Sequence, residues 1–217
     1  MTLQGGANIL DDQAAMARAD SAGMLGLVAG LSKQVAEGWR VAQGLELPWP
    51  SPRAVAVLGM GGSAIGGDLV RGIWGDRITV PVEVLRGYEL PAWVGPDTLV
   101  IASSKSGNTE ETLRQLETVL SRRCPVVCVT TGGALGTVAQ AAGLPLAVFP
   151  DIGAPRTSLG WSLGILTGVL QRAGVLEIDA AEIEAGTASG QAMDDRCAPS
   201  VPTSDNPAKQ LAWSLVD

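Results

Sequence analysis

Serine and threonine side chains crowd one short segment of the sequence, residues 104–109, called here the serine turn. Ser104, Ser106 and Thr109 stand between an apolar run and a helical pattern that begins with Glu110 and Glu111. Each hydroxyl can donate to a phosphate oxygen, and the N–H groups and positive dipole end of a helix N-terminus favour the same dianion. A capped helix alone would explain one hydroxyl and the two acids, but not three spaced hydroxyls. The segment therefore predicts a phosphate-binding turn.

A second turn, rich in glycine, follows the apolar run 54–58. Its sequence, Gly59-Met60-Gly61-Gly62-Ser63, is called here the glycine turn, and it lets backbone N–H groups approach an anionic group closely. Residues 59–64 also match the G-x-G-x-x-A pattern of dinucleotide sites, which need an acidic residue at the end of the next strand. Glu83 lies inside that strand and Arg86 follows it, so a nicotinamide site fits poorly. A tight turn whose glycines serve packing alone is the other alternative.

Short apolar runs alternate with helical patterns through the middle of the chain. This alternation is typical of the α/β class, with a doubly wound, flavodoxin-like parallel sheet flanked by helices. Strands are predicted at 54–58, 80–85, 98–102, 125–130 and 145–149, and helices at 63–74, 109–122, 134–142 and 157–173. Because the carboxyl ends of parallel strands share one sheet edge, we expect the two turns to open on the same edge, where such folds bind ligands.

The segments before and after this pattern are predicted to be helical. Apolar residues at a spacing of three and four predict one amphipathic helix over 20–45. Residues 179–193 are rich in Ala and Glu, residues 197–206 are typical of a linker, and Pro207 suits the first position of a further helix. The chain thus divides into an N-terminal helical segment, 1–45, an α/β domain, 46–175, and a helical linker segment, 176–217.

The composition limits the partners of the chain. Its net charge is −7 and its pI is near 4.6, so we expect no binding to nucleic acid or to an anionic membrane. The uncharged stretches are too short for a membrane span, and the acidic N-terminus is unlike a secretory signal, which predicts a cytoplasmic protein. The chain has no histidine, and Cys124 and Cys128 lie inside an apolar run, so neither a metal nor another cofactor is expected.

Taken together, these motifs resemble the SIS domain of bifunctional phosphoglucose/phosphomannose isomerases. The resemblance rests on residues 59–63 and 104–112, on Pro155-Arg156 before a helix, and on 206–209, which resembles the start of that family's second SIS domain. It implies that Arg156 lies beside the reacting carbons and stabilises an enediolate-like charge. Lys105 stands where the family commonly has an aromatic residue. The residues that the resemblance assigns to the phosphate are Gly62, Ser63, Ser104, Ser106 and Thr109.

The function implied by the resemblance is isomerisation of glucose 6-phosphate or mannose 6-phosphate to fructose 6-phosphate by a homodimer. This reaction needs a base that moves a proton between C1 and C2. In the resembling enzymes the glutamate base, a ring-opening histidine and a lysine come from the second SIS domain. Residues 176–217 are therefore expected to include the start of a truncated second domain, and the chain alone is expected to be a poor catalyst. Glu110 and Glu111 are more simply interpreted as first-turn acids than as a substitute base.

Two other functions fit the same phosphate site. A non-catalytic sugar-phosphate sensor would regulate a partner, often through a DNA-reading helix-turn-helix, but the acidic N-terminal segment lacks a basic face for DNA. An isomerase of another phosphosugar, such as an amino or heptulose sugar, would keep the fold. The two turns do not separate these substrates.

Overall fold

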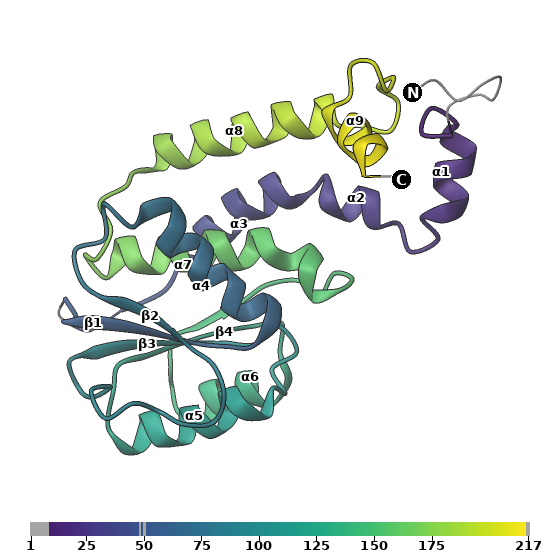
Figure 1. The fold of residues 1–217 in the computed structure, drawn as a ribbon. Helices are drawn as coiled ribbons and strands as arrows, with labels where there is room; N and C mark the ends of the chain where they lie inside the picture. Colours follow the sequence, from purple (N-terminus) through teal and green to yellow (C-terminus); the bar gives the residue numbers. More distant parts are fainter. Residues whose placement is uncertain (1–8, 48, 50, 216–217) are drawn as a thin grey trace.

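A parallel sheet of five strands, in the order β2-β1-β3-β4-β5, lies at the centre of the structure (Figure 1). The structure is a computed structural model, and it describes residues 9–47, 49 and 51–215. The strands are β1 (Ala54–Leu58), β2 (Val82–Leu85), β3 (Thr98–Ser103), β4 (Val126–Thr130) and β5 (Leu146–Val148). The predicted doubly wound, flavodoxin-like sheet is confirmed, and its strand bounds differ from the predicted ones by at most a few residues.

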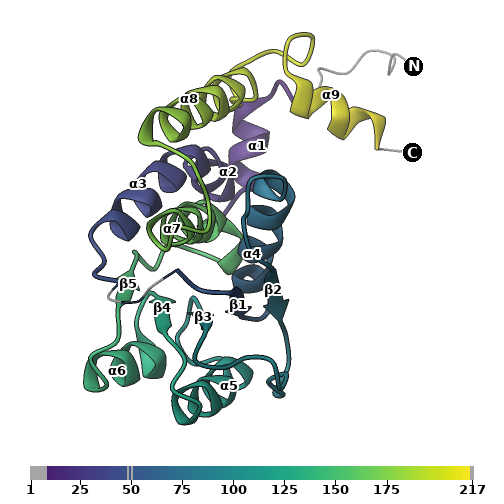
Figure 2. The same ribbon diagram turned by 90° about the vertical axis from the view of Figure 1, so that its left-hand side faces the viewer.

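Helices cover both faces of the sheet, which is why its strands are continuous apolar runs. Figures 1 and 2 show α4 (Gly61–Trp74) and α7 (Leu159–Arg172) on one face, and α5 (Glu110–Ser121) and α6 (Gly133–Ala141) on the other. Successive side chains of β1 alternate between the two resulting cores: Val55 and Val57 pack in the first, Ala56 and Leu58 in the second. The strand residues are therefore fixed in register by burial on both sides.

A third layer packs on the first face, because α3 (Leu31–Gln43) lies directly against α7. Glycines bring the two backbones together. A methyl group built on Gly164 would stand 2.1 Å from the carbonyl oxygen of Val35, and one built on Gly38 would stand 2.7 Å from that of Trp161. These contacts leave no room for any side chain, so the N-terminal segment is part of the same packed body as the sheet.

The single helix predicted over 20–45 is wrong. The chain forms α1 (Gln13–Ala19), then α2 (Met24–Val28), then α3. The carboxylate of Asp20 accepts hydrogen bonds from the N–H groups of Met24 (2.6 Å) and Leu25 (2.9 Å), so a new helix starts there instead of continuing from Asp20. Gly30, the poorest helix former after proline, marks the second break. Apolar spacing cannot reveal interruptions this short.

The C-terminal segment folds back along the N-terminal one. The helix α8 (Ala180–Arg196) runs beside α3, where Ser32 Oγ donates to Asp194 Oδ2 (3.0 Å). The helix predicted from Pro207 is confirmed as α9 (Pro207–Ser214). The ammonium of Lys209, only 5% exposed, donates to Asp11 Oδ1 (3.2 Å) and to the carbonyl oxygens of Pro199 (2.8 Å) and Val201 (2.7 Å). The two terminal segments thus support each other.

The division into 1–45, 46–175 and 176–217 stays a prediction, and its residues 1–8, 48, 50 and 216–217 lie outside the described ones. None of the helices in the described ranges combines the length and apolar content that a bilayer crossing needs.

Candidate functional site

The glycine turn and the serine turn lie where the strand order of the sheet reverses. After β1 the chain enters α4 on one face, and after the neighbouring β3 it enters α5 on the opposite face (Figure 2). Because the two connections diverge, a crevice outside the carboxyl ends of these strands is the usual ligand position in such sheets. The topology therefore places both predicted turns at the expected ligand edge.

The two turns contact each other directly. The backbone N–H of Lys105 donates to Ser63 Oγ (3.2 Å), so the first turn of α4 is joined to the serine turn. Gly59 permits this approach, because a methyl group there would lie 3.1 Å from the carbonyl oxygen of Ser103 and 3.2 Å from the backbone nitrogen of Ala64. The structure thus brings Ser63 and its neighbour Gly62 to the serine turn, as the sequence predicted.

Ser104 and Thr109 form the closed inner side of the serine turn. Their hydroxyl oxygens are 2.8 Å apart, and Ser104 Oγ also accepts the N–H of Gly107 (3.1 Å). Ser104 is buried, with 1% of its surface exposed, whereas Thr109 is half-buried. The pair shares one hydrogen bond, so one of its two hydroxyl hydrogens remains available, and Thr109 is the member that a ligand can reach.

Ser106 forms the open side of the same turn. Its side chain is exposed, and its hydroxyl oxygen accepts the N–H of Asn108 (3.1 Å), which leaves the hydroxyl hydrogen free to donate. Gly107 makes the reversal possible, since it adopts the left-handed φ of 69°. A methyl group there would stand 1.9 Å from the carbonyl oxygen of Gly132. Ser106 and Thr109 therefore present donors from two sides of one glycine-dependent loop.

At this edge, none of the N-cap residues of α4, α5 and α6 caps its own helix with its side chain. Thr109 is the N-cap of α5 but makes no capping hydrogen bond, and the same is true of Met60 before α4 and Gly132 before α6. Elsewhere Asp12, Asp179 and Asn206 do cap their helices. In α6, Asn108 Oδ1 and the carbonyl oxygen of Gly107 already accept the N–H groups of Ala134 (3.0 Å) and Leu135 (2.9 Å). The N-termini of α4 and α5 thus keep first-turn N–H groups for another acceptor, and capping does not explain the hydroxyl of Thr109.

A third turn, which the sequence analysis missed, supports the serine turn from the β4 side. Thr131 donates to the carbonyl oxygen of Lys105 through both its hydroxyl (2.8 Å) and its N–H (3.1 Å). Asn108 Oδ1 accepts the N–H of Ala134 (3.0 Å) at the start of α6. The signal was present in the sequence, because Thr130-Thr131-Gly132-Gly133 stands between a strand and a helix just as the first two turns do.

Arg156 lies in a short 3₁₀ helix, η1 (Pro155–Ser158), which precedes α7. Pro155 packs on the glycine turn, since a methyl group built on Gly62 would be 3.4 Å from its Cβ and from its carbonyl oxygen. Arg156 is exposed, and no hydrogen bond or ion pair joins its guanidinium to another described residue. The predicted arginine therefore follows a residue that packs on the glycine turn, and its guanidinium has no hydrogen-bond or ion-pair partner among the described residues.

Acidic and aromatic side chains border the site on the β2 side. The exposed Tyr88 follows β2, and the carboxylates of Glu110 and Glu111 raise the pKa of its phenol, because they disfavour a nearby phenolate. Sequence reasoning did not single out Tyr88. Its exposure and its position after a strand were the signals available.

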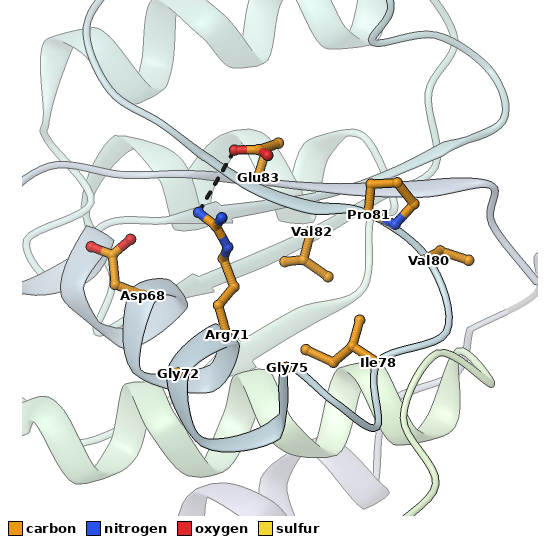
Figure 3. Close-up of a pocket in the computed structure, with 9 residues that line it drawn as sticks. All are labelled: Asp68, Arg71, Gly72, Gly75, Ile78, Val80, Pro81, Val82 and Glu83. Atoms are coloured by element: carbon orange, nitrogen blue, oxygen red, sulfur yellow. Dashed lines mark ion pairs between the residues drawn. The ribbon is translucent and has the colours of Figure 1, made fainter.

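A cavity of about 520 Å³ lies on another part of the molecule, between α4 and the outer edge of β2 (Figure 3). An ion pair between Arg71 and Glu83 (3.7 Å) crosses it, and Asp68 and Pro81 line its sides. None of the residues predicted for the phosphate lines this cavity. Cavity size therefore does not locate the candidate site, which is an arrangement of donors at the sheet edge.

Comparison with known proteins finds curated relatives of the chain. The bifunctional phosphoglucose/phosphomannose isomerase of Caldicellulosiruptor bescii is 39% identical over 161 residues, which are 74% of this chain and 48% of that protein. The protein of the same name from Pyrobaculum calidifontis is 43% identical over 113 residues, 51% of this chain and 34% of that protein. The chain spans about half or less of the length of these curated relatives. No family model matches the sequence.

Solved structures share the fold at lower identity. A hypothetical protein of Thermus thermophilus superposes with a TM-score of 0.69 at 23% identity, over 95% of this chain and 51% of that one. The C-terminal domain of glucosamine-fructose-6-phosphate aminotransferase from Francisella tularensis reaches 0.53 at 13% identity, over 80% of this chain and 54% of that one. In sequence the chain is therefore a relative of the bifunctional phosphoglucose/phosphomannose isomerases, and its fold is the doubly wound α/β fold of SIS domains.

Proposed function

We propose that this chain binds the phosphate of a hexose 6-phosphate at the carboxyl edge of β1 and β3, as part of an aldose–ketose isomerase. The observation that carries the proposal is the convergence of two uncapped helix N-termini with the hydroxyls of Ser63, Ser106 and Thr109 at the point where the strand order reverses. A dianion satisfies these donors together and is favoured by both helix dipoles. The substrates proposed are glucose 6-phosphate, mannose 6-phosphate and fructose 6-phosphate, after the names of the relatives.

Each predicted site residue has a distinct part in this proposal. Gly62 donates its backbone N–H and, without a side chain, lets the backbone come close to the phosphate. Ser63, Ser106 and Thr109 donate through their hydroxyls. Ser104 holds the turn in shape through its bonds to Thr109 and to the N–H of Gly107. Charge-assisted hydrogen bonds contribute roughly 1.5 to 3 kcal/mol each, so three or four of them suffice for micromolar binding after the cost of association.

Arg156 is the residue that we assign to the reacting end of the sugar. Moving a proton between C1 and C2 passes through an enediolate, whose negative charge an uncommitted guanidinium stabilises. The contact of Pro155 with Gly62 supports this assignment, because it keeps the adjoining residue 156 close to the glycine turn. The chain contains no histidine, so it cannot open a sugar ring with an imidazole. We propose that residues 176–217 are a helical linker and the start of a second SIS domain that carries the base.

Titration of the purified chain tests the proposal. We expect fructose 6-phosphate and glucose 6-phosphate to bind and to raise the melting temperature, whereas fructose and glucose without phosphate do not. Ser106→Ala should weaken binding by about 1 to 3 kcal/mol, because an exposed donor is lost without loss of packing. The matched control is Ser121→Ala at the far end of α5, which should leave binding unchanged. The absence of binding to every phosphosugar would refute the proposed function.

Turnover by the chain is a separate measurement. We expect slow or undetectable conversion of fructose 6-phosphate, since no ring-opening histidine is present. An ordinary enzymatic rate would show that the base lies within these residues. We also propose that the working protein is a homodimer, as the resemblance implies, and sedimentation analysis that finds only monomer at micromolar concentration would contradict this.

A further inference from the structure

Lys105 belongs to the serine turn, and its backbone is hydrogen-bonded to the turn on each side, the glycine turn and the turn after β4. Its N–H donates to Ser63 Oγ (3.2 Å) in the glycine turn, and its carbonyl oxygen accepts from the hydroxyl (2.8 Å) and the N–H (3.1 Å) of Thr131. With its main chain fixed by neighbours from β1 and β4, the residue has a defined direction in which to project its side chain.

The side chain of Lys105 reaches the loop that follows β5. Its ammonium forms an ion pair with the carboxylate of Asp151 and donates to the carbonyl oxygen of Gly153 (2.9 Å). Only 15% of the lysine side chain is exposed, against 70% of that of Asp151. An ammonium so far removed from water depends on its protein partners more than one in an exposed ion pair does. The contact is therefore a tether between the serine turn and the loop.

The loop that Lys105 holds, residues 151–156, leads to Arg156 and is shaped by its own hydrogen bonds. Thr157 Oγ1 donates to the carbonyl oxygens of Ala154 (2.7 Å) and Ile152 (3.2 Å). The carbonyl oxygen of Thr157 accepts from Gln34 Nε2 (2.8 Å), which anchors the far side of the loop to α3. These bonds keep the loop compact, but none of them joins it to the serine turn.

We propose that Lys105 is a positioning residue that couples the phosphate site to Arg156. This inference rests on the proposed function, and it adds the means by which the sugar end is recognised. The ammonium fixes the loop against the serine turn, and Pro155 is fixed against Gly62, so the backbone at Arg156 is held at a set place from which its guanidinium reaches the sugar beyond the bound phosphate. The tether acts on the part of the ligand beyond the phosphate, because none of the phosphate donors lies in the loop.

The first test needs no ligand. Amide hydrogen exchange of residues 151–158 should become faster in Lys105→Met, which keeps the length of the side chain but removes the ammonium, and in Asp151→Asn. Lys105→Arg restores a cation of similar reach and should return exchange toward the wild-type rate. Lys33→Met is the matched control, because it removes the same charge from an exposed pair with Glu37. Unchanged exchange in Lys105→Met would overturn the tether.

The second test uses calorimetry to compare binding of a whole phosphosugar with binding of inorganic phosphate alone. In Lys105→Met the Kd for fructose 6-phosphate should rise about tenfold or more, because the contact of Arg156 with the sugar is lost, while the Kd for inorganic phosphate changes by less than about threefold. Lys105→Arg should recover most of the lost affinity. An equal rise in both Kd values would overturn the proposal, because Lys105 would then act as a direct charge on the phosphate.

Together, the exchange and calorimetry experiments distinguish failure of this inference from failure of the proposed function on which it rests. If the wild-type chain binds neither ligand, the proposed function fails, whereas the exchange rates still decide whether Lys105 holds the loop. If the wild type binds both ligands and Lys105→Met binds both with unchanged Kd, the proposed function stands and the positioning role of Lys105 is refuted.

Discussion

The backbone nitrogen of Lys105 lies 3.2 Å from Ser63 Oγ, and this single hydrogen bond joins two turns that are separated in the chain by α4, β2 and β3. Ser63 belongs to the first turn of α4 and Lys105 to the loop before α5, and these two helices lie on opposite faces of the sheet. Their contact brings the N-termini of α4 and α5 together at one edge of the sheet. In the proposed function, a phosphate at this edge would receive donors from both turns.

The two serines of the serine turn should respond differently to substitution. Ser104 is buried and bonded to Thr109 and Gly107, so Ser104→Ala should lower the free energy of unfolding by about 1 to 3 kcal/mol and weaken phosphosugar binding as well. Ser106 is exposed, so Ser106→Ala should leave the free energy of unfolding within about 0.5 kcal/mol of the wild type. Urea unfolding together with calorimetric titration measures both effects. Equal losses of stability would contradict the division of roles.

Gly107 should tolerate no side chain. It combines a φ of 69° with a distance of 1.9 Å from the position of an added methyl group to the carbonyl oxygen of Gly132. Gly107→Ala should therefore cost at least about 2 kcal/mol in the free energy of unfolding and abolish phosphosugar binding. Gly186→Ala in α8 is the control: its added methyl group meets nothing within 4 Å, so it should stabilise the chain by about 0.5 to 1 kcal/mol. A Gly107→Ala variant that is as stable as the wild type and still binds the phosphosugar would show that the loop has another shape.

The contact between α3 and α7 should depend on Gly164. A methyl group there would stand 2.1 Å from the carbonyl oxygen of Val35, which is backbone and cannot rotate away. We expect Gly164→Ala to lower the free energy of unfolding by about 1 to 3 kcal/mol, because the helices must move apart. Gly72→Ala in α4, where an added methyl group meets nothing within 4 Å, should be harmless. Thermal and urea unfolding distinguish the two variants, and equal stabilities would refute the close approach.

Stability at alkaline pH should reflect the thiol of Cys128. Burial raises the pKa of this thiol to about 12 from an ordinary value of 9.0. Above pH 9 the unfolded chain loses the proton while the folded chain keeps it, so stability that is fully present below pH 9 is lost as the pH rises toward 12. At 1.36 kcal/mol for each pH unit, the loss attributable to Cys128 approaches about 4 kcal/mol.

The variant Cys128→Ala tests this directly. Its free energy of unfolding should be lower than that of the wild type near neutral pH, because of the cavity, but should fall less steeply above pH 9. Urea unfolding in the presence of a reducing agent, measured at a series of pH values, gives the two slopes. Cys197→Ala, at a half-buried position, is the matched control. Parallel curves for the wild type and Cys128→Ala would contradict the prediction.

The sequence by itself determined the local parts of this protein. Runs such as 54–58 and 126–129 are apolar at every position, which is typical of strands buried on both faces, and the glycine and serine turns are recognisable by residue type. The alternation of strands and helices then dictated a parallel sheet and a common edge for both turns. Local composition and chain order suffice for these features because each depends on neighbours in the sequence.

Tertiary structure alone decided which of these parts touch. The support of Lys105 by Thr131 and the ion pair from Lys105 to Asp151 depend on residues brought together from distant positions. Periodicity and residue type report the preference of a segment for one conformation, but they carry no information on which distant partner fills a hydrogen bond. The strand order brings those partners together, and with them Pro155 and Arg156 beside the glycine turn.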